Sequence, residues 1–167
     1  METPVQIYTD GGCSGNPGPG GWAYIIMGTG DRGSEIGGEE PGNGNLVLLA
    51  EKWGAEKNTT NNRMELIAVI EALRALKNLE GVPSRQAVVY TDSQYVQKGI
   101  TEWIRKWKLN SWRTSDKKPV KNRDLWMELD TLAAELPLGW EWVRGHAGID
   151  YNERCDRMTQ EAIGSIQ

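Results

Sequence analysis

VQIYTDGGCSGNPGPGG, residues 5–21, begins as a strand and brings a carboxylate to its end. Val5, Ile7 and Thr9 occupy alternate positions, and this pattern predicts a β-strand. Asp10 falls on the opposite face of that strand. Six Gly and two Pro among the next eleven residues predict an immediate turn. Because an unpaired buried carboxylate is unfavourable, Asp10 is either a solvated strand-end residue or part of a site that binds a cation.

A second copy of this arrangement lies about eighty residues later, in VVYTDS, residues 88–93. The run 87–91 predicts a strand, and Asp92 follows it directly. Two apolar strands that both end in Tyr-Thr-Asp favour one shared explanation over two solvated aspartates. We therefore expect Asp10 and Asp92 to belong to one site.

The composition is typical of one globular domain over residues 1–167. No apolar run approaches the roughly 18 residues of a membrane span, and no basic and apolar leader begins the chain. The two cysteines, Cys13 and Cys155, have neither a metal-site spacing nor a disulfide pattern. We expect a monomer in the reducing cytoplasm, with no membrane partner.

A basic segment interrupts an otherwise acidic chain. The net charge is −4, but residues 98–123 contain nine basic and only two acidic residues. Trp103 and Trp107 are one helical turn apart within it, on one helix face. The segment is either a nucleic-acid-binding patch or a helix whose tryptophans complete the core while its lysines are solvated.

The remaining patterns predict an alternation of strands and helices. Strands are expected at 22–27, 33–38 and 140–144, and helices at 63–79, 93–98, 100–113, 122–136 and 152–163, with Gly99 as a break. Residues 39–57 are expected to form a loop or hairpin insertion. Within it, the pattern at 46–53 predicts a short strand or one helical turn. This order favours an α/β fold with a mixed sheet and helices packed on it.

Two further carboxylates, Glu65 and Asp156, are expected on helices. Glu65 is either a ligand or an anion placed in the first helical turn to suit the helix dipole. If the two strands are neighbours, Asp10 and Asp92 cannot both ionise without a cation between them. Oxygen ligands without a Cys/His cluster favour Mg²⁺ or Mn²⁺ over zinc, and paired ions of this kind promote in-line displacement at phosphorus. His146 is either a hydrogen-bonded loop residue or a proton shuttle.

Taken together, the motifs resemble ribonuclease H of type 1. The matching stretches cover most of the chain: YTDGGCSGNPGPGGW (8–22), TTNNRMEL (59–66), YTDSQYVQKGITEWI (90–104), DKKPVKNRDLW (116–126) and WEWVRGHAGIDYNERCD (140–156). The resemblance implies a five-stranded mixed sheet, with strands 1–3 antiparallel and helices on both faces. It also implies an endonuclease that cuts the RNA strand of RNA–DNA hybrids.

The resemblance assigns roles to individual residues. It implies two Mg²⁺ ions, replaceable by Mn²⁺, held by Asp10, Glu65, Asp92 and Asp156, with His146 assisting. The basic segment, about 99–122, would grip the DNA strand. The implied substrate contacts are Thr60 and Asn122 on DNA phosphates, Cys13, Asn16, Asn61, Asn62 and Gln94 on the RNA strand, and Trp103 and Trp126 along the DNA channel.

The chain departs from the family pattern in two places. The stretch of about 39–57 is longer than usual. Met158 and Thr159 stand where the family more often has a Leu-Ala pair, a change expected to affect packing and not the ligands. No separate hybrid-binding domain is expected.

Three other functions remain open at this point. A hybrid-binding module without catalysis would not need four carboxylates. A related nuclease or transposase domain acting on DNA would not need the GNPGPGG and TTNNRMEL motifs. A viral, polymerase-linked version would normally be fused to its polymerase.

Overall fold

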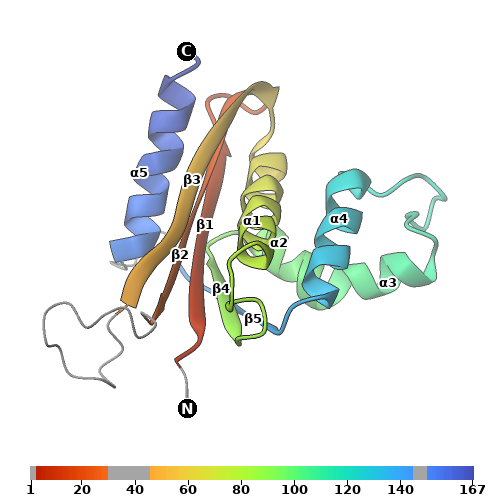
Figure 1. Cartoon of the computed structure of the whole chain (residues 1–167). Coiled ribbons are helices and arrows are strands. Elements are labelled where there is room, and N and C mark those ends of the chain that lie inside the picture. The colour runs from red at the N-terminus through yellow and green to blue at the C-terminus, as the bar shows by residue number, and fades with distance from the viewer. Residues whose placement is uncertain (1–2, 30–45, 145–149) are drawn as a thin grey trace, which may run out of the picture.

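The structure, a computed structural model, describes residues 3–29, 46–144 and 150–167. Its centre is a five-stranded sheet in the order β3-β2-β1-β4-β5 (Figure 1). The strands are β1 (Val5–Cys13), β2 (Gly18–Thr29), β3 (Leu46–Thr59), β4 (Ala87–Thr91) and β5 (Leu138–Trp142). β1, β2 and β3 are antiparallel neighbours, whereas β4 runs parallel to both β1 and β5. The predicted mixed sheet is confirmed.

Helices cover both faces of the sheet, as predicted. α1 (Asn61–Lys77) packs on one face with α4 (Arg123–Ala134) beyond it, and α5 (Asp150–Gly164) packs on the other (Figure 1). The larger apolar core lies between the sheet and α1, and a smaller one lies between the sheet and α5. No helix among the described residues has the length and apolar character needed to cross a bilayer.

The glycines after Asp10 extend the first strand and do not end it. β1 continues to Cys13, which pairs with Gly20 of β2. The prediction of an immediate turn was therefore wrong. Close packing explains the glycine at position 11, because a Cβ there would lie 2.6 Å from the backbone nitrogen of Glu65 in α1. The missing side chain lets α1 approach β1 beside Asp10.

The expected insertion over residues 39–57 needs correction. Residues 46–57 belong to β3, which pairs antiparallel with β2 along its length. The expected short strand at 46–53 is confirmed as part of this longer strand, and the helical-turn alternative was wrong. β3 is an edge strand with exposed side chains on both faces, so its sequence lacks the alternation that a half-buried strand shows. The expected strand at 33–38 and the rest of the insertion lie outside the described residues.

Gly99 does not break the helix that follows β4. α2 (Gln94–Lys98), a π-helical turn (Gly99–Trp103) and α3 (Ile104–Leu109) follow one another without interruption. A Cβ at position 99 would overlap the ring of the buried Trp126, so glycine permits close packing of this turn against α4.

Gly99→Ala is expected to lower the free energy of unfolding by about 2–3 kcal/mol, because the added methyl group must displace the Trp126 ring. Urea unfolding checks this value. Gly164→Ala, at the end of α5, is the matched control, since a Cβ there meets no atom within 4 Å. A Gly99→Ala variant as stable as Gly164→Ala would contradict the packing argument.

Candidate active site

The parallel pairing of β1 with β4 brings two aspartates to one place. The last paired residues are Tyr8 and Tyr90, and Asp10 and Asp92 each follow two residues later. β4 ends at Thr91, whereas β1 continues alongside β2, so the sheet opens at this point. Sites in such sheets form at the carboxyl ends of parallel strands.

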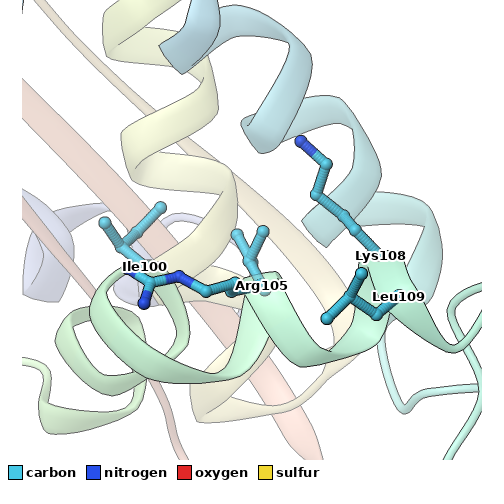
Figure 2. A pocket seen from close by; sticks show the side chains of 5 residues that line it. Ile100, Arg105, Lys108 and Leu109 are labelled. Carbon is cyan, nitrogen blue, oxygen red and sulfur yellow. The ribbon is translucent and has the colours of Figure 1, made fainter.

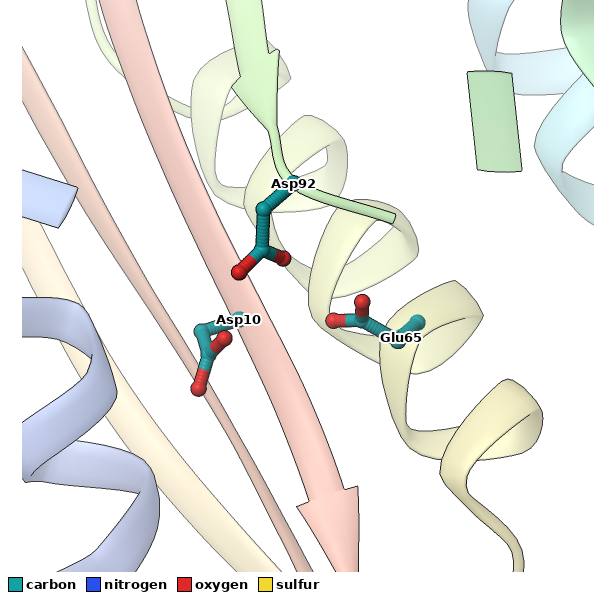
Figure 3. Close-up of side chains that lie close together, drawn as sticks. All are labelled: Asp10, Glu65 and Asp92. Atoms are coloured by element: carbon teal, nitrogen blue, oxygen red, sulfur yellow. The ribbon is translucent and has the colours of Figure 1, made fainter. Parts of the chain in front are cut away.

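Glu65 joins the two aspartates from α1. One carboxylate oxygen from each of Asp10, Glu65 and Asp92 lies within 4.8 Å of the other two (Figure 3). The Thr60 hydroxyl caps α1 by accepting the Arg63 N–H at 3.2 Å, so the helix begins at Asn61. Glu65 therefore lies beyond the first turn, and its interpretation as a dipole-stabilised first-turn anion was wrong.

The three carboxylates fit a divalent cation. Oε1 of Glu65 is buried and has no hydrogen-bond partner among the described residues. A buried polar atom without a partner is unfavourable unless another group satisfies it. The ligand set consists only of oxygen atoms, which suits Mg²⁺ or Mn²⁺.

Burial and mutual repulsion perturb the carboxyl groups. The pKa of Asp10 is raised to about 7, mainly because burial disfavours the charged form and because Asp92 and Asp156 add negative charge. Hydrogen bonds from the Thr159 hydroxyl and the Gly11 N–H act in the opposite direction. Charge at this site is therefore unfavourable without a cation.

The pKa of Glu65 is also raised well above its ordinary value. Burial is again the main cause, followed by the charges of Asp10 and Asp92. The Gly11 N–H and the Ser93 hydroxyl lower it. Two neighbouring carboxyls thus both favour their protonated forms, which is the behaviour of a site that holds excess negative charge.

These shifts predict how stability depends on pH in EDTA. The pKa of Asp10 is higher in the folded than in the unfolded chain. The Asp10 carboxyl therefore stabilises the fold fully below its unfolded pKa of about 4, and this stabilisation is lost as the pH rises through about 7. At pH 8 we expect Asp10→Asn to exceed the wild type in free energy of unfolding by roughly 2 kcal/mol, with the difference vanishing near pH 4. Urea unfolding at both pH values measures it. If the wild type were more stable than Asp10→Asn at pH 8, the raised pKa of Asp10 would be contradicted.

The structure places the two remaining predicted catalytic residues differently. Asp156 lies on α5, and its charge raises the pKa of Asp10 and of Cys155, but it is not part of the three-carboxylate group. His146 lies outside the described residues. Three of the four predicted ligands are thus brought together, and Asp156 lies on α5 at a place where its charge acts on Asp10.

Three of the five predicted RNA contacts, Cys13, Asn16 and Asn61, form a polar cluster where the β1–β2 hairpin meets α1. The Cys13 N–H donates to Asn61 Oδ1 at 2.8 Å, and the Asn61 N–H donates to Asn16 Oδ1 at 3.2 Å. Gln94 is exposed at the start of α2, and Asn62 is half-buried beside Asn61. Their roles toward a substrate remain predictions.

A second network surrounds the predicted DNA-side residues. Asn122 accepts a hydrogen bond from Arg63 at 3.2 Å and donates to the Tyr95 hydroxyl at 3.1 Å, and that hydroxyl also accepts the Trp126 Nε1–H at 3.0 Å. Trp103 is half-buried, with its ring 5.6 Å from Tyr95. Trp126 is fully buried, so any support that it gives to a DNA channel comes from beneath the surface, and its role toward substrate stays a prediction.

Sequence reasoning missed Tyr95 and Arg63 as members of this network. Both lie inside the quoted motifs, but nothing in their spacing shows that they meet Asn122, which is 27 and 59 residues away in the chain. The fold alone brings them together.

The basic segment stands away from the sheet on α3 and the loop after it (Figure 1). All nine of its Lys and Arg side chains are exposed. A groove of about 430 Å³ lies on it, with Ile100, Ile104 and Leu109 beside Arg105 and Lys108 (Figure 2). Trp103 and Trp107 contact each other and pack against the core, which the structural interpretation of the segment expected. Binding of nucleic acid by its exposed cations stays a prediction.

Comparisons with known proteins agree with this fold. The family model described as RNase H matches residues 2–164. Ribonuclease H of Treponema denticola is 50% identical over 169 residues, which cover 95% of this chain and 96% of the relative. Ribonuclease H of Cupriavidus necator is 52% identical over 164 residues, which cover 97% of each chain. LC9-RNase H1, described as a type 1 RNase H with the type 2 active-site motif, aligns with a TM-score of 0.81 at 33% identity, over 100% of this chain and 75% of that chain. The chain belongs to the RNase H family.

Proposed function

We propose that this chain is a divalent-cation-dependent endonuclease that hydrolyses the RNA strand of RNA–DNA hybrids. The observation that carries the proposal is the convergence of Asp10, Glu65 and Asp92, from two strands and a helix, within 4.8 Å. Family membership supports the substrate class. The products are expected to carry 5′-phosphate and 3′-hydroxyl ends.

The carboxylates would act as ligands. Asp10, Glu65 and Asp92, with Asp156 from α5, would hold two Mg²⁺ ions, or Mn²⁺ in their place, which supply an activated water and stabilise the leaving oxygen. The strands and α1 keep the three clustered side chains in position before substrate arrives, so little reorganisation is needed during the reaction. We assign His146 a proton-transfer role that assists product release.

The polar cluster at the hairpin would recognise RNA. Asn16 and Asn61 are exposed, and each amide carries an NH₂ donor besides the oxygen that already accepts a backbone N–H. Such groups can exchange hydrogen bonds with a 2′-hydroxyl, which distinguishes RNA from DNA. Thr60 and Asn122 are assigned to DNA phosphates. We propose that the enzyme acts as a monomer in the cytoplasm, on RNA primers and R-loops formed during DNA replication.

The proposal is tested with one sequence prepared as an RNA–DNA hybrid, an RNA duplex and a DNA duplex, all in Mg²⁺. We expect cleavage of the hybrid only. Cleavage of the DNA duplex would favour a DNA nuclease, and hybrid binding without any cleavage would favour a binding module.

Neutralising the exposed cations Lys106, Lys117 and Lys118 together is expected to weaken hybrid binding. Each lost phosphate contact should reduce the slope of log K against log salt by about 0.7–0.9. Fluorescence anisotropy at several salt concentrations measures the slope. Neutralising Lys52 and Lys77, which lie outside the basic segment, should leave it unchanged, and an unchanged slope in the triple variant would remove the segment from the interface.

A further inference from the structure

Arg63 on α1 joins the two residues that are assigned to DNA phosphates. Its backbone N–H donates to the Thr60 hydroxyl oxygen at 3.2 Å, and its Nη1 donates to Asn122 Oδ1 at 3.2 Å. Thr60 caps α1, whereas Asn122 directly precedes α4 and is 59 residues away from Arg63 in the chain. Both contacts use an oxygen as the acceptor, so the hydroxyl proton of Thr60 and the NH₂ group of Asn122 remain as donors.

Asp124 fixes the Arg63 guanidinium in this place. Its two carboxylate oxygens accept hydrogen bonds from Nη1 at 3.3 Å and from Nη2 at 3.1 Å. A two-point contact of this kind restrains the plane of the guanidinium, which a single hydrogen bond does not do. The Arg63 side chain is therefore held by α4 although it lies at the surface, with 33% of its area exposed.

The orientation of the Asn122 amide follows from its two neighbours. A guanidinium has only donors, so the amide atom that faces Arg63 must be the oxygen. The NH₂ group then donates to the Tyr95 hydroxyl at 3.1 Å, and the buried Trp126 Nε1–H anchors the same hydroxyl at 3.0 Å. This contact uses one N–H of the amide, and the other has no acceptor among residues 3–29, 46–144 and 150–167.

We propose that Arg63 is a positioning residue, which holds the Asn122 amide so that its remaining N–H faces a phosphate oxygen of the DNA strand. This inference rests on the proposed function, because it concerns the assigned contact of Asn122 with DNA. The surroundings favour an anion, since Lys121 and Arg123 are exposed on either side of Asn122. An amide donor between two cations is suited to an oxygen that carries negative charge.

Steady-state cleavage of the hybrid by the full chain tests this role. Arg63→Lys keeps the positive charge but loses the two-point contact with Asp124. We expect its KM for the hybrid to rise about tenfold and its kcat to change less than about twofold, because Asn122 would contact the strand that is not cut. Arg74→Lys is the matched control, since Arg74 also lies on α1 and pairs with Glu128 of α4, and its KM should stay within about twofold of the wild type.

A double-mutant cycle separates positioning from direct contact. Asn122→Gly removes the amide, and glycine accepts the left-handed backbone of this residue, whose φ is 59°. If Arg63 acts through Asn122, adding Arg63→Lys to Asn122→Gly should raise KM by less than about twofold. A further tenfold rise would mean that Arg63 contacts the hybrid by itself, and it would overturn the positioning role.

The DNA strand as the source of the phosphate is tested with hybrids in which one DNA phosphate at a time is a neutral methylphosphonate. One position should raise KM about tenfold with the wild type but less than about twofold with Arg63→Lys, because this variant has already lost the contact. If no position along the DNA strand behaves in this way, the proposed ligand is wrong.

Asp124→Asn provides a second route should Arg63→Lys fold poorly in urea unfolding. It leaves Arg63 in place and removes a negative charge, which alone would strengthen binding to DNA. We expect KM to rise about threefold instead, because the guanidinium is no longer held. A KM at or below the wild-type value in whichever of these variants folds would overturn the positioning role alone, whereas a wild type that does not cut the hybrid would overturn the proposed function.

Discussion

Asp10→Asn is expected to lower the rate of RNA cleavage in a hybrid at least about a thousandfold, which corresponds to about 4 kcal/mol of transition-state stabilisation. Asp10 is buried, and it lies between Glu65 and Asp92 on one side and α5 on the other. An amide has nearly the same shape but no charge, so the cation loses a ligand while the fold is retained. Single-turnover cleavage at saturating Mg²⁺ measures the loss.

Hybrid binding by Asp10→Asn should remain close to the wild-type value, because the basic segment and the polar cluster are untouched. Asp130→Asn is the matched control. Its carboxylate pairs with Lys108 at 3.3 Å on the surface of α4, and it should cleave at the wild-type rate. A cleavage rate in Asp10→Asn equal to that of Asp130→Asn would remove Asp10 from the site.

Gly11→Ala is expected to damage stability and catalysis together. The added Cβ would lie 2.6 Å from the Glu65 nitrogen, so α1 must move away from β1. We expect the free energy of unfolding to fall by about 3 kcal/mol. We also expect cleavage to slow about a hundredfold, since Glu65 moves relative to Asp10 and small displacements of catalytic groups have effects of this size.

Gly12→Ala separates this effect from a general intolerance of side chains in β1. A Cβ on Gly12 meets only Asn61 Oδ1, at an ordinary 3.7 Å. Its free energy of unfolding should stay within about 1 kcal/mol of the wild type. Urea unfolding and cleavage of both variants provide the comparison. Equal behaviour of the two would mean that the approach of α1 to β1 does not position Glu65.

Local sequence was sufficient for the elements that carry the site. The repeated Tyr-Thr-Asp predicted that Asp10 and Asp92 would meet, and the parallel register of β1 and β4 confirms it. The motifs also predicted Glu65 as the third member, and the mixed sheet with helices on both faces is confirmed. The two strands were predictable because alternation is a local property, whereas the role of Glu65 and the helices on both faces were implied by the resemblance.

The predictions were wrong where the residue type is determined by packing against a residue far away in the sequence. Gly11 and Gly99 were interpreted as turn and break signals, but each is small because a helix or a tryptophan ring lies against it. β3 lacks alternation because it is an edge strand.

The most direct test of the account follows both strands of one RNA–DNA hybrid, each labelled at its end, with the wild-type chain in EDTA and then with Mg²⁺ restored. We predict that the RNA strand stays intact in EDTA and is cut when Mg²⁺ returns, while the DNA strand is intact throughout. RNA cleavage that continues undiminished in EDTA would contradict the carboxylate cation site as the centre of the reaction.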